Sequence, residues 1–225
     1  MSKKTRFNIK YKTTPIRSSS DDFWAYGVNI TKPNHPHVTD IREDGFVPQH
    51  FASKVWQSNF LLMDMLSALP VKNQLNVIEI GAGWGALSVF MNKHFDAAVI
   101  ASDLDENLWP YQQMLAQRND SNITSKVLPI EQITDRVLAE TDLIIASDIC
   151  YDNDTKNALQ SLVELVACRN DVVFLLADIG RKAFMRLSED NEIFQDVKLR
   201  PRSISEPVDM QGYVLSVNPI REILC

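Results

Sequence analysis

The sequence predicts an α/β protein in which helices cover both faces of a mostly parallel sheet. Three observations support this prediction. Short runs of Val, Ile and Leu alternate with amphipathic helical patterns from about residue 51 onward. These runs are almost continuously apolar, as expected for strands that are buried on both faces. The last two predicted strands follow one another without a helical pattern between them, which indicates an antiparallel hairpin at the end of the sheet.

Composition and length fit one folded domain with an N-terminal extension. The chain has 225 residues, of which 45% are hydrophobic and 23% are charged, as in a soluble globular protein. We divide it into an N-terminal arm, partly irregular, over residues 1–50 and a main domain over residues 51–225. The first residues lack the apolar segment of a secretory signal, and no run is long enough to cross a membrane. We therefore expect no membrane partner.

The charge, cysteine and histidine content of the chain indicates which partners, cellular location and metals to expect. The net charge is −6, which argues against a nucleic-acid partner, because affinity for polyanions comes from clustered Lys and Arg. Three cysteines form no Cys-x-x-Cys pair, so we expect a reducing, cytoplasmic location. The four histidines show no metal-ligand spacing, and no metal is predicted. Residues 1–20 carry six Lys or Arg and no acid, as in a solvated tail or a contact strip for an acidic partner.

The elements follow in a regular order. Within the arm, which is interrupted by prolines, one short strand is expected near residues 26–30. A helix over 55–69 ends at Pro70. The alternating strands and helices then run as strand 76–80, helix 85–95, strand 97–102, helix 108–118, strand 125–128, helical stretch 130–138, strand 143–146, helix 155–167 and strand 171–177. Strands 194–200 and 212–217, separated by a long polar connection, complete a seven-stranded sheet with a C-terminal antiparallel β-hairpin. The whole is a Rossmann-like three-layer αβα sandwich.

A glycine-rich motif joins the first sheet strand to its helix. Glu79, Gly81, Gly83 and Gly85 follow the pattern E-x-G-x-G-x-G. Glycines let a ligand approach the backbone closely, and the helix that follows presents free N–H groups. A dinucleotide site uses the related G-x-G-x-x-G pattern. The acid at position 79 favours the cationic amino group of S-adenosylmethionine (SAM) over a pyrophosphate, although a dinucleotide site and a purely structural turn stay open.

Acidic residues end the next two strands. Asp103 closes the second strand, where a carboxylate can accept hydrogen bonds from both ribose hydroxyls of an adenosine, and it could also cap a helix. Leu104 would then lie beside the adenine. Glu131, after the third strand, is a candidate for the adenine amino group or a solvent-facing residue of a first helical turn.

The segment Asp148-Ile-Cys-Tyr151, after the fourth strand, resembles the D/E-x-x-Y/F motif of methyltransferase family 16. This seven-β-strand, class I family includes many protein-lysine methyltransferases. Val55-Trp56 and Leu115–Asn119 are similar to two further family segments. Ala177–Arg181 resembles a segment of the electron-transfer-flavoprotein β-subunit lysine methyltransferases and their bacterial relatives, with Ile179 in place of their Pro. The resemblance covers roughly residues 50–218.

The resemblance implies a SAM-dependent methyltransferase that releases S-adenosylhomocysteine. It implies that Trp56 and Ser147 belong to the cofactor site, that Asp148 orients the acceptor amine and that Tyr151 provides an aromatic wall. Asp148 followed by Tyr151 could also be a helix cap and a packing aromatic. Asp178 and Arg181 could line the acceptor channel or form a structural ion pair.

The expected acceptor is a lysine side chain of a protein. The alternative is a small amine or other metabolite, because nicotinamide-type N-methyltransferases share the fold. An open groove would suit a protein, and a lidded pocket would suit a metabolite. A non-catalytic scaffold and a dinucleotide oxidoreductase are further hypotheses.

Overall fold

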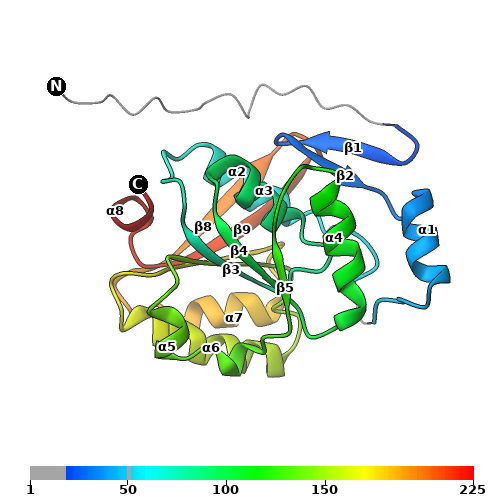
Figure 1. Ribbon diagram of the computed structural model, residues 1–225. Helices are drawn as coiled ribbons and strands as arrows, with labels where there is room; N and C mark the ends of the chain where they lie inside the picture. The colour runs from blue at the N-terminus through cyan, green and yellow to red at the C-terminus, as the bar shows by residue number, and fades with distance from the viewer. Residues whose placement is uncertain (1–18, 50–51) are drawn as a thin grey trace.

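The computed structural model describes residues 19–49 and 52–225. It confirms the predicted fold class, with a seven-stranded sheet at the centre of the molecule (Figure 1). Six strands run parallel, and only β9 runs antiparallel to its two neighbours. In spatial order the strands are β5 (Thr124–Lys126), β4 (Ala98–Ser102), β3 (Asn76–Ile80), β6 (Leu143–Ser147), β7 (Val173–Asp178), β9 (Met210–Val217) and β8 (Val197–Ile204).

Helices cover both faces of this sheet. Figure 1 shows α5, α6 and α7 below the sheet, with α2 and α3 above it. The bounds on the first face are α2 (Asn59–Ser67), α3 (Ala86–Phe95) and α4 (Trp109–Gln117). Those on the second face are α5 (Asp135–Leu138), α6 (Asn153–Ala167) and α7 (Lys182–Asp190). Two 3-10 turns, η2 (Glu106–Leu108) and η3 (Ile130–Gln132), and the C-terminal helix α8 (Ile220–Leu224) complete the set.

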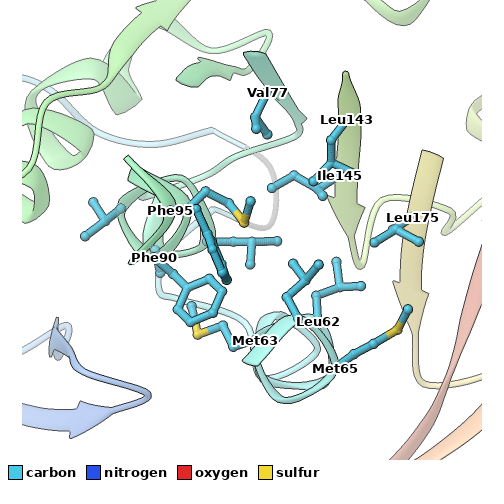
Figure 2. Close-up of a cluster of buried hydrophobic side chains, with 14 of the residues drawn as sticks. Leu62, Met63, Met65, Val77, Phe90, Phe95, Leu143, Ile145 and Leu175 are labelled. Carbon is cyan, nitrogen blue, oxygen red and sulfur yellow. The ribbon is translucent and has the colours of Figure 1, made fainter. Parts of the chain in front are cut away.

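Strand alternation divides the apolar core into two layers, because successive side chains of a strand point to opposite faces. On the first face, Val77, Ile145 and Leu175 pack toward Leu62 of α2 and Phe90 of α3, as Figure 2 shows. On the second face, the intervening strand residues Ile78, Ile144 and Phe174 pack in one cluster with Leu162 of α6 and Phe184 of α7. The near-continuous apolar runs in the sequence are thus explained by burial on both sides.

The arm contains more structure than predicted. The short strand expected near residues 26–30 is present as β2 (Val28–Thr31), and it pairs with a strand that was not predicted, β1 (Asp22–Ala25), to form a hairpin. Tyr26 and Gly27 form its turn, both with positive φ, +50° and +76°, as two-residue hairpin turns require. Because Tyr rarely takes this conformation, the turn left no strong signal in the sequence.

A proline that was taken as an interruption begins a helix. Helix α1 (Pro36–Glu43) has Pro36 in its first turn, where the missing N–H removes no helical hydrogen bond. His35 caps this helix, and its Nδ1 accepts a hydrogen bond from the backbone N–H of His37 at 3.0 Å. The basic residues of the N-terminal tail, at positions 3 to 17, lie outside the described residues.

Asn119 fixes the arm to the main sheet. Its side-chain Oδ1 accepts from the Asn29 backbone N–H at 2.7 Å, and its Nδ2 donates to the Asn29 carbonyl at 2.9 Å and to the Leu115 carbonyl at 2.8 Å. The segment 115–119, which carries part of the family resemblance, therefore holds β2 against the end of α4.

Two boundaries differ from the prediction for identifiable reasons. Helix α2 begins at Asn59 rather than at residue 55, because residues 52–58 form turns ahead of it. Strand β8 continues through Pro201 to Ile204, although residues beyond 200 were expected to form a connection. A proline is tolerated there because β8 lies at the edge of the sheet. Among the helices of the described residues, none combines the length and apolar character needed to span a membrane.

Candidate active site

The candidate site lies at the carboxyl edge of the parallel strands. Ile80 at the end of β3 pairs with Ser102 of β4, and Ser147 at the end of β6 pairs with Ala177 of β7. These strands therefore end at one level, and the loops that follow them meet. Ligands of open α/β sheets bind at this edge.

The glycine turn leaves open space at its centre. Gly81 and Gly83 have φ values of +62° and +53°. A Cβ added to Gly81 would lie 2.4 Å from Cγ2 of Ile149, whereas one added to Gly83 would meet no heavy atom within 4 Å. Gly81 is thus required by the packing of the protein itself. The free space beside Gly83 can take part of a ligand that approaches the backbone.

Asp103 joins the glycine turn to the end of β4. Its Oδ2 accepts a hydrogen bond from the Gly83 N–H at 2.9 Å, and its Oδ1 accepts from the Asp105 N–H at 3.3 Å. Burial raises the pKa of Asp103 above its usual range, and these N–H donors oppose the rise. Since each carboxylate oxygen can accept more than one hydrogen bond, the group can still receive two hydroxyls. Asp105, not Asp103, caps the following turn η2, so the helix-cap interpretation of Asp103 is wrong.

Glu79 is buried beneath the turn. Its Oε2 accepts from the backbone N–H of Ser88 at 2.7 Å and from Ser88 Oγ at 2.5 Å. Desolvation raises the pKa of Glu79 to about 8, although both hydrogen bonds lower it. Glu79 therefore connects β3 to the first turns of α3.

The segment before α2 lies beside the glycine turn. Trp84, within the glycine motif, donates from Nε1 to the Ala52 carbonyl at 2.9 Å, which fixes the chain four residues before Trp56. Trp56 is half-buried, and Lys54 Nζ lies 4.7 Å from the centroid of its ring. The Trp56 carbonyl accepts from Nδ2 of Asn59 at 2.9 Å.

Two residues of the site were missed by the sequence analysis. The buried side chain of Asn59 connects Trp56 with Ser147, whose Oγ donates to Asn59 Oδ1 at 2.9 Å. Its signal in the sequence is a lone amide at the start of an apolar helix. Gln112 of α4 is fully buried and donates from Nε2 to the Gly83 carbonyl at 3.1 Å. It stands in an ordinary amphipathic pattern and gave no signal.

Asp148 follows β6 in an unusual backbone conformation. Its φ is +60°, a left-handed value that is uncommon outside glycine and tends to occur at functional sites. Its carboxylate is 7% exposed and forms an ion pair with Arg181. The N-cap of α6 is Asp152, which forms a capping box with Thr155. The interpretation of Asp148 as a helix cap is therefore wrong.

Apolar side chains at this edge are unusually exposed. Leu104, Tyr151 and Ile179 follow β4, β6 and β7 and are 71%, 47% and 54% exposed. Burial raises the pKa of the Tyr151 hydroxyl, and the negative charges of Asp152 and Asp103 raise it further. The loops after β4 and β6 are thus close enough for their charges to interact. A ligand at this edge would cover surface that now faces water.

The fifth strand adds an ion pair and an open pocket. Arg181 Nη1 donates to Oδ2 of the fully buried Asp178 at 2.8 Å. The two residues therefore form an ion pair, one of the two alternatives given above, and their place in the acceptor channel stays a prediction. Nearby, a pocket of about 420 Å³ opens to solvent. It is lined by Ile179, Pro201, Arg202, Ser203, Gln211, Gly212 and Tyr213.

Two predictions are not decided by this geometry. Glu131 lies exposed on η3, and its contact with adenine stays a prediction. Within residues 19–49 and 52–225, no three His, Cys, Asp or Glu side chains group as a metal site would require.

A Rossmann-like sheet with a glycine turn after β3, an acid after each of the two strands that flank β3 and an exposed aromatic residue is typical of SAM-dependent methyltransferases. The chain belongs to the lysine methyltransferase family, methyltransferase family 16, whose profile matches residues 34–198. This match confirms the resemblance drawn from the sequence. The protein is accordingly a SAM-dependent methyltransferase. Comparison with curated proteins finds no match.

Solved structures share the fold at low identity. A methyltransferase from Pyrococcus furiosus is 15% identical, with a TM-score of 0.53 over 72% of this chain and 83% of that one. A putative SAM-dependent methyltransferase from Methanococcus maripaludis is 13% identical, with a TM-score of 0.52 over 72% and 84%. A human methyltransferase 10 domain containing protein is 12% identical, with a TM-score of 0.50 over 81% of each chain. These likenesses concern the fold alone.

Proposed function

We propose that this enzyme methylates the side-chain nitrogen of a lysine in a protein substrate. The observation that carries the proposal is the pair Asp148 and Tyr151, which follow β6 at the carboxyl edge beside the glycine turn. A carboxylate next to a half-exposed aromatic ring suits an amine on an aliphatic chain. Tyr151 and Ile179 are 47% and 54% exposed, so this edge of the sheet is open to solvent, which favours a protein over a metabolite.

The residues around the glycine turn fit the cofactor. We propose that Gly81 and Gly83 let SAM approach the backbone, that Asp103 accepts from the ribose and that Leu104 covers the adenine. Burial raises the pKa of Glu79 to about 8, so Glu79 is mostly protonated at pH 7 without ligand. It would lose its proton as the cationic amino group binds, and would then provide negative charge toward it. Trp56 and Ser147, which Asn59 connects, would line the methionine side. When bound, SAM supplies a methyl group made electrophilic by its sulfonium.

The acceptor must reach the site as a neutral amine. An ordinary lysine has a pKa of about 10.4, so deprotonation at pH 7 costs about 4.6 kcal/mol. Asp148 accepts a hydrogen bond from the amine and directs its lone pair, and Tyr151 holds the aliphatic chain. The departing proton passes to solvent or, second, to Asp148. Exclusion of water and alignment of the nucleophile provide the remaining rate enhancement.

The proposal is tested by following the methyl group. Tritiated SAM and the purified enzyme are incubated with host lysate, and protein bands are separated from small molecules. The labelled protein band is hydrolysed with acid, and the labelled amino acid is identified by chromatography. Label on methyl-lysine supports the proposal. Label only in the small-molecule fraction would replace it with the metabolite alternative.

A variant separates the acceptor residue from the cofactor site. Asp148→Ala should abolish transfer while the Kd for SAM changes less than about threefold, because Asp148 is assigned to the amine. Asp154→Ala, an exposed acid in the first turn of α6, serves as the control with wild-type activity. A parallel loss of SAM binding and turnover in Asp148→Ala would reassign the residue to the cofactor or to folding.

A further inference from the structure

Arg181 connects two buried carboxylates at the acceptor side of the site. Its Nη1 donates to Oδ2 of Asp178 and to Oδ1 of Asp148. The side chain of Asp178 is 0% exposed and that of Asp148 is 7% exposed, against 28% for Arg181. Arg181 thus lies between a fully buried acid and the acid that we assign to the acceptor.

Asp178 is fully engaged in holding Arg181. Its Oδ1 accepts from the backbone N–H of Gly180 at 2.8 Å and of Arg181 at 2.7 Å, while its Oδ2 accepts from the guanidinium. Three donors from one turn fix both oxygens. Asp178 therefore has little capacity left for a substrate, and its contacts instead define where the guanidinium lies.

A second arginine of the same chain forms a similar pairing with two acids that are exposed. Arg169, which precedes β7 at the opposite edge of the sheet, contacts Asp135 and Asp171. Those two acids are 75% and 59% exposed, and such surface pairs contribute little. Burying the charges of the Arg181 pairing costs far more desolvation. Because this desolvation is unfavourable, we look for a function of the Arg181 pairing in the site itself.

The role follows from the charge of Asp148. A carboxylate without a cation would stabilise the ammonium form of an incoming lysine and raise its pKa, which opposes transfer. We propose that Arg181, positioned by Asp178, partly neutralises Asp148 and thereby sets the site to bind the acceptor lysine as a neutral amine. This inference rests on the proposed function, since it concerns the protonation of that acceptor.

The other titratable groups nearby do not take over this role. Burial raises the pKa of Cys150 to about 12 and also raises the pKa of Tyr151, so both are neutral at pH 7. Asp152 is an exposed anion whose pKa is lowered by hydrogen bonds from Thr155. The remaining charged groups around the turn are Lys156, which pairs with Asp190, the exposed Lys182, and Asp103.

The test compares the pH dependence of transfer. Wild-type enzyme and the double variant Arg181→Gln/Asp178→Asn receive tritiated SAM and the same lysate fraction, and label in protein is measured from pH 6.5 to 9.5. The double variant removes the charge of the fully buried Asp178 together with that of Arg181, so that Asp148 alone is left without its cation. In the double variant, the rising limb of the plot of transfer rate against pH should move to higher pH by about one unit. The reason is that the acceptor amine now faces Asp148 without Arg181 beside it, which raises the pKa of the amine. Arg169→Gln/Asp171→Asn is the matched control and should follow the wild-type profile.

Further measurements distinguish positioning from folding. The Kd for SAM should stay within twofold in every variant, and thermal unfolding identifies loss of structure. Arg181→Lys keeps a cation without the planar guanidinium, so it should move the rising limb of the pH profile by about half a unit. If the double variant does not fold, this single variant tests the inference. Coincident profiles for the folded variants and wild type would overturn the inference. Absence of label in protein with wild-type enzyme would refute the lysine acceptor itself, and the inference with it.

Discussion

At the level of single residues, Gly81 and Gly83 differ in the space that the protein leaves for a side chain. Gly81→Ala places a Cβ 2.4 Å from Ile149, so the fold must shift. Gly83→Ala meets no protein atom, and its left-handed φ costs only about 1–2 kcal/mol. We expect Gly83→Ala to fold but to lose at least tenfold in SAM affinity, whereas Gly81→Ala loses stability first. Calorimetric SAM titration and thermal unfolding of both variants check this. Unchanged affinity in Gly83→Ala would mean that no ligand enters that space.

Glu79 allows a separate test of charge. Glu79→Gln keeps an oxygen for the Ser88 N–H but cannot take up the negative charge that Glu79 would gain by losing its proton when SAM binds. We expect SAM to bind about tenfold more weakly, the equivalent of about 1.4 kcal/mol, with no loss of folding stability at pH 8 and above. The sign follows from the pKa of about 8. A buried acid whose pKa is higher in the folded than in the unfolded protein contributes less to folding stability as the pH rises from the unfolded pKa to the folded pKa, here from 4.5 to about 8. Equal SAM affinity in the variant would restrict Glu79 to holding α3.

The predictability of site residues depended on where each one stands relative to a strand end. Glu79 and Asp103 were predicted from the glycine motif and from a strand end, and Asp148 from its resemblance to a family motif. Each of these signals is tied to the end of an apolar strand run. Asn59 and Gln112 support the same site from helices. Their roles depend on which helix face meets the loops, and helical periodicity alone does not specify that.

At the level of elements, the docking of the N-terminal hairpin should depend on pH. His94 of α3 contacts the Tyr26 carbonyl through Nε2 at 2.6 Å, and burial lowers the pKa of His94 to about 4. The unfolded chain binds a proton below about pH 6.5 and the folded chain does not. Stability is therefore complete above pH 6.5 and falls toward pH 4, by at most about 1.4 kcal/mol per pH unit from this group.

Denaturant unfolding between pH 7 and pH 4.5 measures this effect. His94→Gln should flatten the slope, whereas His37→Gln, in which an exposed histidine of α1 is replaced, should keep it. Burial also lowers the pKa of His35, so a smaller slope of the same sign should persist in His94→Gln. Equal slopes in all three proteins would show that His94 does not become protonated on unfolding in this range.

The elements of the main domain were predictable because the buried apolar residues of each one recur with the period of a strand or a helix. The parallel strands and their covering helices appear in the expected order, and the final hairpin is antiparallel. The failures occur where a single residue decides the local structure. Pro36 starts a helix instead of interrupting one, Tyr26 accepts a left-handed turn, and Pro201 is tolerated because its strand has one neighbour. Each depends on tertiary surroundings that a local pattern does not contain.

At the level of the whole molecule, cofactor binding should stabilise the fold. A ligand that binds only the folded state at 100 times its Kd adds about 2.7 kcal/mol, which for a chain of this size raises Tm by about 5–10 °C. We expect this shift with SAM and with S-adenosylhomocysteine but not with NAD. Gly83→Ala should show little shift and serves as the control. A shift with NAD alone would select the dinucleotide hypothesis.

The insertion of β9 between β7 and the edge strand β8 affects the order in which the sheet can assemble. The last strand of the sheet in sequence inserts between β7 and β8, and its Tyr213 both pairs with Asp178 and lies under Gly180. A nascent chain that has not yet released residues 210–217 from the ribosome leaves β7 with an open hydrogen-bonding edge. The turn that carries Arg181 would then lack its support, so this side of the site should mature only after residues 210–217 have left the ribosome.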